Sequence, residues 1–256
     1  MKNITVILTL LLSSFVLFYY FSKNNSKKTE PFSANTTTLV VGTNAEYPPF
    51  AYIKNDTIIG FDIDLIKEIA QRLDKKIEIK DMPFDVLIPE IQRGSVDLIA
   101  AGMTPSPERE KEVIFTKCYF TGDPLVIVSP KEEPLRTIDD LTDKKIVVNE
   151  GYTADYYMTD IKGPELVRLP APAAAFLALE SKRVDAYVAA RSTIASFFEQ
   201  DTSDKYVTTE IPKTEEKYAL AVSPHAAELT PKINQLIDEI KKDGTFDKLK
   251  KKWNIE

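Results

Sequence analysis

Cysteine and histidine are almost absent from this chain. Among its 256 residues there is one cysteine, Cys118, and one histidine, His225. A single cysteine excludes a disulfide within the chain and a metal site built from cysteines. A single histidine leaves a histidine-ligated metal or a serine–histidine–aspartate triad without its usual partners. We therefore expect neither a metal nor a cofactor, and we interpret Cys118 as a small buried side chain.

An excess of positive charge is missing as well. The chain has 33 Lys and Arg against 39 Asp and Glu, which gives a net charge of −6. A nucleic-acid-binding domain needs a basic face, so this balance argues against nucleic acid as a partner. The lysine-rich stretch 248–253 is predicted to be a solvated last helix, with Leu249 and Trp253 turned inward at i, i+4 spacing.

The N-terminus predicts export. Lys2 precedes an apolar-rich run over residues 4–21, and a polar segment over 22–37 follows it. A lysine followed by a hydrophobic stretch is typical of an export signal, and this run is also just long enough to span a bilayer. No cysteine lies directly after the run, which excludes a lipoprotein signal. We interpret residues 1–37 as an export signal or membrane anchor plus a polar linker, and expect a protein of the periplasm or cell envelope. Cleavage of the signal and the final membrane face stay open.

From residue 38 onward, predicted strands and helices alternate. Short apolar runs predict strands at 38–42, 77–79, 96–100, 113–115, 125–128, 145–148, 166–169, 184–188 and 218–222. Amphipathic or capped stretches predict helices at 60–73, 84–93, 139–141, 154–158, 173–181, 192–198, 226–242 and 246–253. Asn55-Asp56 predicts a hairpin-like turn. The alternation predicts an α/β protein with mainly parallel sheets.

The stretch 101–109 is the most informative part of the chain for function. Ala101 and Gly102 leave the backbone open to close approach, and Thr104 offers a hydroxyl. Arg109 adds a permanently charged planar group that can bind a carboxylate through two hydrogen bonds. These residues predict a cradle for a small anion. The alternative is a solvated surface turn in which Arg109 pairs with a neighbouring glutamate.

Three ordered motifs resemble the polar amino-acid-binding proteins that serve ABC importers, the solute-binding proteins of family 3. They are YPPF at 47–50, GFDIDL at 60–65, and AGMT at 101–104 followed by Arg109. The resemblance covers residues 38–255, and within the family it points most to the arginine-binding members, the chlamydial one in particular.

The resemblance implies a two-lobed periplasmic-binding-protein (Venus-flytrap) fold with two interlobe crossings. Lobe 1 would comprise 38–122 and 221–256, and lobe 2 would comprise 123–220. A ligand would bind in the cleft and close the lobes by a hinge motion. The implied function is that of a monomeric, non-enzymatic binding protein. It would capture an L-amino acid, arginine above all, and deliver it to an ABC permease in the inner membrane.

The resemblance also implies roles for particular residues. Arg109 would pair with the ligand α-carboxylate, and the backbone N–H groups of Thr153 and Ala154 would share that charge. The hydroxyl of Thr104 and the carbonyl of Gly102 would accept hydrogen bonds from the α-ammonium. Tyr47 and Phe84 would stack on the two sides of the ligand side chain. Glu46 and Asn44 would accept hydrogen bonds from the N–H groups at its far end. The full predicted ligand-binding set is Asn44, Glu46, Tyr47, Phe84, Ala101, Gly102, Met103, Thr104, Arg109, Tyr152, Thr153 and Ala154.

One position departs from the family pattern. Family members supply an aspartate from lobe 2 to hold the α-ammonium, and by counting along the strand after Val184 that place falls on Ala190. Either another acid such as Glu46 or Asp123 takes over, or neutral acceptors hold the ammonium. Two other function classes stay open: a cyclohexadienyl (prephenate or arogenate) dehydratase, which the same fold supports, and a sensory or surface-interaction module. For the enzyme, no paired acid and base stand out.

Overall fold

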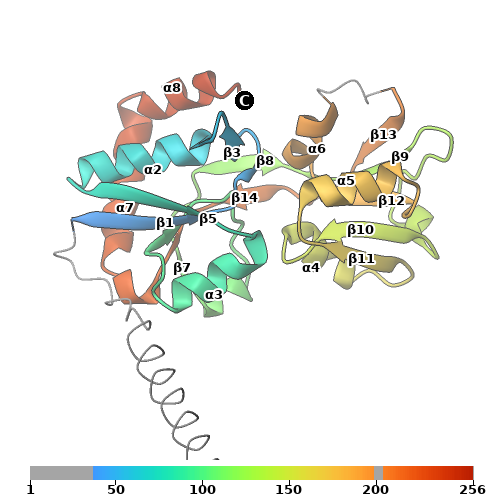
Figure 1. The fold of residues 1–256 in the computed structure, drawn as a ribbon, viewed down its shortest axis with the longest axis horizontal. Helices are drawn as coiled ribbons and strands as arrows, with labels where there is room; N and C mark the ends of the chain where they lie inside the picture. Colours follow the sequence, from blue (N-terminus) through green and yellow to red (C-terminus); the bar gives the residue numbers. More distant parts are fainter. Residues whose placement is uncertain (1–36, 199–203, 256) are drawn as a thin grey trace, which may run out of the picture. The chain divides into compact units, whose positions relative to one another are not determined.

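The computed structural model describes residues 37–198 and 204–255, and this part of the chain contains two five-stranded sheets with helices packed on them (Figure 1). The predicted export signal or anchor falls on residues outside the described ranges, apart from residue 37. Among the described residues, no helix combines the length and apolar character needed to cross a bilayer.

The first sheet has the strand order β5-β1-β6-β15-β7. Its strands are β1 (Thr38–Thr43), β5 (Lys76–Asp81), β6 (Leu98–Ile99), β7 (Ile114–Phe115) and β15 (Ala221–Val222). Alternate residues of β1 contact two different cores, because successive side chains of a strand point to opposite faces. Leu39 and Val41 pack with α2 (Phe61–Arg72), α7 (Leu229–Lys242) and α8 (Thr245–Lys252), whereas Val40 packs with α3 (Leu87–Gln92).

The second sheet has the strand order β11-β10-β12-β9-β13. Its strands are β9 (Leu125–Pro130), β10 (Lys145–Asn149), β11 (Glu165–Leu169), β12 (Ala186–Ala190) and β13 (Tyr206–Glu210). On one face Ile146 and Val148 pack with α4 (Thr153–Thr159). On the other face Val147 packs with α5 (Pro172–Glu180) and α6 (Arg191–Phe198). Both sheets are therefore covered on two faces, as the alternation of strands and helices predicts.

Two small sheets complete the described fold. β2 (Glu46–Tyr47), β3 (Ala51–Lys54) and β4 (Thr57–Ile59) form an antiparallel meander, and Asn55 and Asp56 both have positive φ in its turn. The predicted hairpin-like turn is thereby confirmed. β8 (Phe120–Asp123) and β14 (Glu216–Tyr218) pair antiparallel. In chain order β8 leads from the first sheet to the second, and β14 leads back.

The prediction of mainly parallel sheets is wrong. Each sheet has two parallel and two antiparallel pairings, because β15 runs against β6 and β7, and β9 runs against β12 and β13. Parallel neighbours require a long crossover, usually through a helix. β9 and β15 instead enter their sheets directly from β8 and β14, without a preceding helix.

Three local predictions differ in detail from the structure. The apolar run 218–222 is two strands rather than one, since Tyr218 pairs with β8 and Ala221 joins the first sheet. The strand predicted at 184–188 lies two residues later, at β12. Cys118 is half-buried rather than buried. In the lysine-rich tail, Leu249 and Trp253 do pack against the first core, as predicted.

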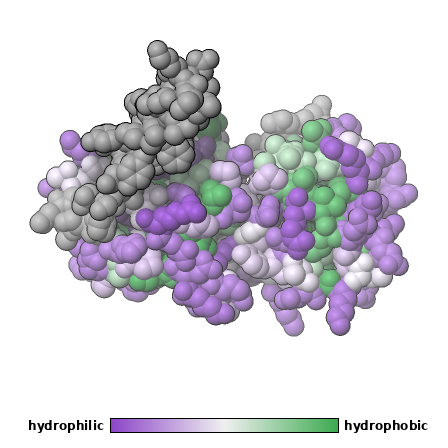
Figure 2. All heavy atoms as spheres, turned by 60° about the horizontal axis from the view of Figure 1, so that its bottom comes forward, coloured by the Kyte–Doolittle hydropathy of each residue, from purple (hydrophilic) through white to green (hydrophobic). Residues whose placement is uncertain are grey.

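The described surface is mixed in character. Figure 2 shows hydrophilic side chains over most of the visible described face, with hydrophobic ones between them. Large hydrophobic side chains that are exposed within the described ranges are Ile53, Tyr156 and Leu177.

Candidate ligand-binding site

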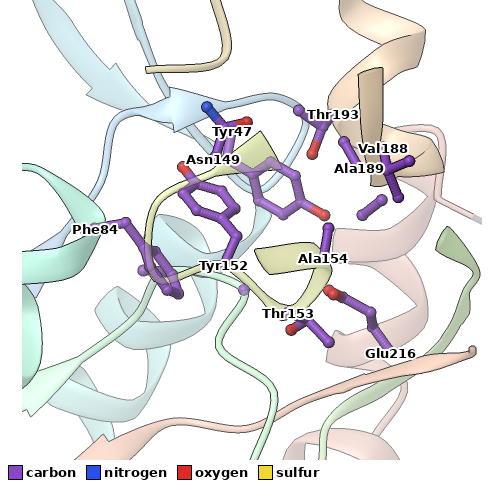
Figure 3. A pocket seen from close by; sticks show the side chains of 13 residues that line it. Tyr47, Phe84, Asn149, Tyr152, Thr153, Ala154, Val188, Ala189, Thr193 and Glu216 are labelled. Atoms are coloured by element: carbon purple, nitrogen blue, oxygen red, sulfur yellow. The ribbon is translucent and has the colours of Figure 1, made fainter. Parts of the chain in front are cut away.

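A cavity lies where residues from both large sheets and from β14 meet (Figure 3). Several of its lining residues lie at the ends of strands: Ala101 lies two residues after β6, Asn149 is the last residue of β10 and Ala190 is the last residue of β12. In open α/β sheets, ligands bind outside the carboxyl ends of the strands, so this is the expected location for a site. The described lining residues are Tyr47, Phe84, Ala101, Gly102, Asn149, Tyr152, Thr153, Ala154, Val188, Ala189, Ala190, Thr193 and Glu216.

Three aromatic rings form one part of the wall. Phe84 begins a 3₁₀ turn before α3, and Tyr152 is the residue before α4; their ring centroids are 4.4 Å apart. The Tyr152 hydroxyl donates a hydrogen bond to Oδ1 of Asn44 over 2.8 Å, which holds the ring in place. Tyr47 comes from β2, and Figure 3 shows its ring between Tyr152 and Thr193. Aromatic faces of this kind bind flat cationic or apolar groups.

Gly102 is required at its position by both conformation and space. Its φ is 56°, and a Cβ there would lie 2.7 Å from Cε1 of Tyr47. Its N–H donates to Oδ2 of Asp62 over 2.7 Å, and the hydroxyl of Tyr119 donates to Oδ1 of the same carboxylate over 2.7 Å. Asp62 is fully buried, and burial raises its pKa to about 7 although both hydrogen bonds lower it. Asp62 of the GFDIDL motif thus fixes the loop around Gly102 from the side that faces away from the cavity.

Glu216 is the only charged residue among the described residues that line the cavity. Its side chain is buried, and Figure 3 shows the carboxylate turned toward Thr153 and Ala154. Burial above all, together with the negative charge of Asp123, raises the pKa of Glu216 to about 7. Hydrogen bonds from Thr153 and Tyr218 and the positive charge of Arg109 act in the opposite direction.

Beside the cavity, a cluster of four polar side chains joins Tyr47 and Tyr218, which belong to the core of the first sheet, to Ser192 of α6, which packs on the second sheet. Oδ2 of Asp123 accepts hydrogen bonds from the hydroxyls of Tyr47 (2.9 Å), Tyr218 (2.5 Å) and Ser192. Oδ1 of Asp123 accepts from the backbone N–H of Ser192 over 3.1 Å. Tyr47 Oη and Ser192 Oγ are also 2.6 Å apart. We call these four residues the Asp123 cluster.

Arg109 lies in a neighbouring groove rather than in the cavity wall. Its Nη1 donates to the carbonyl of Thr104 over 2.6 Å, and its Nη2 donates to the carbonyl of Gly151 over 2.8 Å. Its guanidinium carbon is 5.3 Å from the ring centroid of Phe84 and 5.5 Å from that of Tyr156. The side chain is buried, and this burial lowers its pKa.

The structure brings seven of the twelve predicted site residues into the cavity wall: Tyr47, Phe84, Ala101, Gly102, Tyr152, Thr153 and Ala154. The other five lie next to it or further out. Asn44 is buried behind Tyr152, Met103 and Arg109 line the neighbouring groove, and Glu46 is exposed. The hydroxyl of Thr104 has no hydrogen-bond partner among the described residues. The roles assigned to these residues stay predictions.

The cavity wall also contains residues that sequence reasoning did not select: Asn149, Val188, Ala189, Thr193 and Glu216. Asn149 follows a clear apolar strand, so the rule on strand ends could have found it. Glu216 lies in a polar stretch, 212–217, with no periodicity and no motif around it. No local signal distinguishes it from the adjacent Glu215.

The fold and the cavity together define a two-domain α/β binding protein of the periplasmic-binding-protein type. Over residues 39–256 the chain matches, and it belongs to, the bacterial extracellular solute-binding proteins, family 3. It is 33% identical over 227 residues to the arginine-binding extracellular protein ArtP of Bacillus subtilis, a match that covers 84% of this chain and 85% of ArtP.

A chlamydial relative and a solved structure agree with this assignment. The probable ABC transporter arginine-binding protein ArtJ of Chlamydia trachomatis is 24% identical, with 87% of this chain and 88% of ArtJ covered. An ancestral arginine-binding protein bound to arginine superposes with a TM-score of 0.80 at 37% identity, covering 85% of this chain and 98% of that protein. The family consists of solute-binding proteins, and these relatives are named as arginine-binding proteins rather than as enzymes.

Proposed function

We propose that this protein binds L-arginine in the cavity and delivers it, outside the cytoplasm, to an ABC importer of the inner membrane. The observation that carries the proposal is the aromatic part of the cavity wall. Tyr47, Phe84 and Tyr152 come from three separate elements and meet around one space. A planar guanidinium stacks favourably on such faces. Several relatives are named as arginine-binding proteins, which supports arginine, whereas others are named for histidine or glutamine.

In the proposed complex, the ligand α-carboxylate is bound by the N–H groups of Thr153 and Ala154 and by Arg109. Arg109 would exchange its hydrogen bonds to the carbonyls of Thr104 and Gly151 for two bonds to the carboxylate. Charge-assisted hydrogen bonds between a guanidinium and a carboxylate are stronger than those to neutral carbonyls, so the exchange is favourable.

The proposed lobes are those expected from the resemblance: 38–122 with 221–256, and 123–220. β8 and β14 would form the connection between the lobes, and a hinge motion at these strands would open the cavity to ligand. We further propose that the protein is a monomer held in the periplasm or cell envelope, and that only the liganded form docks on the permease.

Thermal unfolding of residues 35–256 against twenty L-amino acids tests the proposal, followed by calorimetric titration of those that respond. A ligand at 100 times its dissociation constant adds about 2.7 kcal/mol to the free energy of unfolding, which raises the midpoint by several degrees. We expect arginine to give the largest shift, and Arg109→Ala or Phe84→Ala to abolish most of it. Arg136→Ala is the matched control, because Arg136 is an exposed arginine in the part of the chain that forms the second sheet.

Two results would contradict the proposal at different levels. A larger shift with glutamine or histidine would keep the amino-acid-binding function and reject arginine as the ligand. No shift with any of the twenty amino acids would reject the binding function itself.

A second candidate function is a cyclohexadienyl dehydratase, favoured by the carboxyl group of Glu216 in the cavity. A carboxyl group with a pKa of about 7 can deliver a proton at neutral pH. In such a reaction prephenate takes up one proton and gives phenylpyruvate, carbon dioxide and water. Incubation with prephenate under an assay for phenylpyruvate separates the two functions, since turnover that disappears in Glu216→Gln would establish the enzyme.

A further inference from the structure

We propose that Glu216 binds the α-ammonium group of the ligand, in place of the aspartate that Ala190 replaces. The inference rests on the proposed amino-acid-binding function. It assigns a role to a residue on β14, the strand that leads from the second sheet back to the first.

Charge is the first argument. A free amino acid carries an α-ammonium group, and a buried ammonium needs a negative or strongly polar partner. Among the described lining residues of the cavity, Glu216 alone carries a charge. Its side chain is 6% exposed, and no ion pair to it is found within residues 37–198 and 204–255. A buried carboxylate that lines a cavity without a paired cation is suited to a cationic ligand group.

The second argument is the position of Glu216 in the cavity, which favours the α-ammonium of the ligand over its guanidinium as the group that Glu216 binds. The α-ammonium and α-carboxylate share one carbon atom, so their binding groups must be neighbours. Glu216 accepts a hydrogen bond from Thr153, the residue whose backbone N–H is proposed to bind the carboxylate. Figure 3 shows Phe84 and Tyr152 on the other side of the cavity, where the proposal places the guanidinium.

The other acids considered for this role are excluded by their surroundings. Asp123 accepts four hydrogen bonds from Tyr47, Tyr218 and Ser192, which leaves little capacity for a ligand. It is also absent from the described lining of the cavity. Glu46 is exposed and lies outside the wall as well. Ala190 does line the cavity. The negative charge that the family pattern places at the end of β12 is therefore supplied from β14 in this chain.

The surroundings of Glu216 couple ligand binding to protons. In the free protein burial and Asp123 raise its pKa to about 7, whereas Thr153, Tyr218 and Arg109 lower it. Tyr47 and Tyr152 also face it, and both stay neutral because burial raises their pKa values above that of an ordinary tyrosine. A bound ammonium stabilises the carboxylate and lowers its pKa. Below pH 7 binding must therefore release a proton, and the affinity must fall as the pH falls.

The experiment compares arginine with 5-guanidinopentanoate, which lacks only the α-amino group, by calorimetric titration at pH 5.5 and 8. At pH 8 we expect Glu216→Gln to weaken arginine binding by about 10–100-fold, the effect of losing a charged hydrogen-bond partner. We expect a change below about threefold for 5-guanidinopentanoate, because it has no ammonium to lose. Adding Ala190→Asp to Glu216→Gln should restore most of the arginine affinity. Glu215→Gln is the matched control, an exposed neighbour that should change neither affinity.

The wild-type protein alone supplies a second measurement. Between pH 7 and 5.5 its arginine affinity should fall by up to about tenfold per pH unit, and titration in two buffers of different ionisation enthalpy should show proton release. Both effects should be absent from Glu216→Gln.

Three results would overturn the inference while leaving arginine binding intact. They are unchanged arginine affinity in Glu216→Gln, an equal loss for arginine and 5-guanidinopentanoate, and no proton release by the wild type at pH 6. Failure of the wild type to bind any amino acid would instead reject the proposed function.

Discussion

At the scale of single residues, Asp62 shows how a family motif acts on the cavity without lining it. Its two carboxylate oxygens accept the N–H of Gly102 and the hydroxyl of Tyr119, and no salt bridge to it is found in the described part of the chain. Gly102 in turn has a backbone conformation that favours glycine and leaves no space for a side chain beside Tyr47. The loop that lines the cavity is therefore held in one conformation by a buried acid.

This buried acid predicts a pH dependence of stability. The pKa of Asp62 is about 7 in the folded state, above the ordinary value of 3.8, so the folded state holds more protons than the unfolded state between these values. The free energy of unfolding must then decrease as the pH rises from 4 to 7. Glu216 and Asp97, whose pKa values burial also raises, contribute in the same direction.

Urea unfolding of Asp62→Asn at pH 5 and pH 8 tests this prediction. We expect the loss of stability between the two pH values to be smaller than in the wild type, because one of the ionisable groups is gone. Asp56→Asn, at an exposed turn position with positive φ, should retain the full wild-type difference. An undiminished difference in Asp62→Asn would show that this carboxyl does not titrate in the folded protein.

At the scale of elements, α7 illustrates how periodicity determines packing. Its buried residues follow an i, i+4, i+7, i+8, i+11 pattern, and all join the core on one face of the first sheet: Leu229, Ile233, Leu236, Ile237 and Ile240. The spacing matches the 3.6-residue period of a helix with one apolar stripe. Local helix propensity and tertiary packing both favour a helix here, which is why the helix predicted at 226–242 ends at the same residue as α7, Lys242.

Truncation within this stripe should be costly. Ile233 is fully buried, so we expect Ile233→Ala to lower the free energy of unfolding by about 2–5 kcal/mol, measured by urea denaturation. The adjacent and exposed Lys232 provides the control, since Lys232→Ala should stay within about 0.5 kcal/mol of the wild type. Equal effects for the two variants would contradict the packing of α7 described above.

At the scale of the whole described fold, the Asp123 cluster connects the core of the first sheet with a helix that packs on the second. Tyr47 comes from β2, Asp123 from β8, Ser192 from α6 and Tyr218 from β14. Tyr47 also lines the cavity, so one side chain takes part both in the proposed ligand contact and in the link between the sheets. A change that breaks the link is expected to affect ligand affinity from outside the cavity wall.

Ser192→Ala tests this coupling. It removes the hydroxyl that contacts Tyr47 and Asp123, while Asp123 keeps its bonds from the two tyrosines. We expect a loss of arginine affinity of about tenfold, the effect of one hydrogen bond to a charged group. Calorimetric titration measures it, and Ser181→Ala is the control because Ser181 bonds only to the end of α5 and to Arg183. Unchanged affinity in Ser192→Ala would mean that the cluster is structural only.

The amino-acid sequence by itself determined the α/β class, most helices, the hairpin turn at Asn55-Asp56 and the family motifs. It also predicted seven residues of the cavity wall. These features follow from local rules, since helical periodicity, turn conformations and short motifs each depend on residues close together in the chain.

Only the tertiary structure decided the directions in which strands pair and which acid lines the cavity. Glu216 and Thr153 are neighbours in space although 63 positions of the sequence separate them, and Tyr47 meets Asp123 across 76. Such contacts depend on how β8 and β14 pair and on how the sheets pack, and no local pattern contains that information. Glu215 and Glu216 are the same residue type in adjacent positions; one is exposed and the other buried, because successive side chains at a strand point to opposite faces.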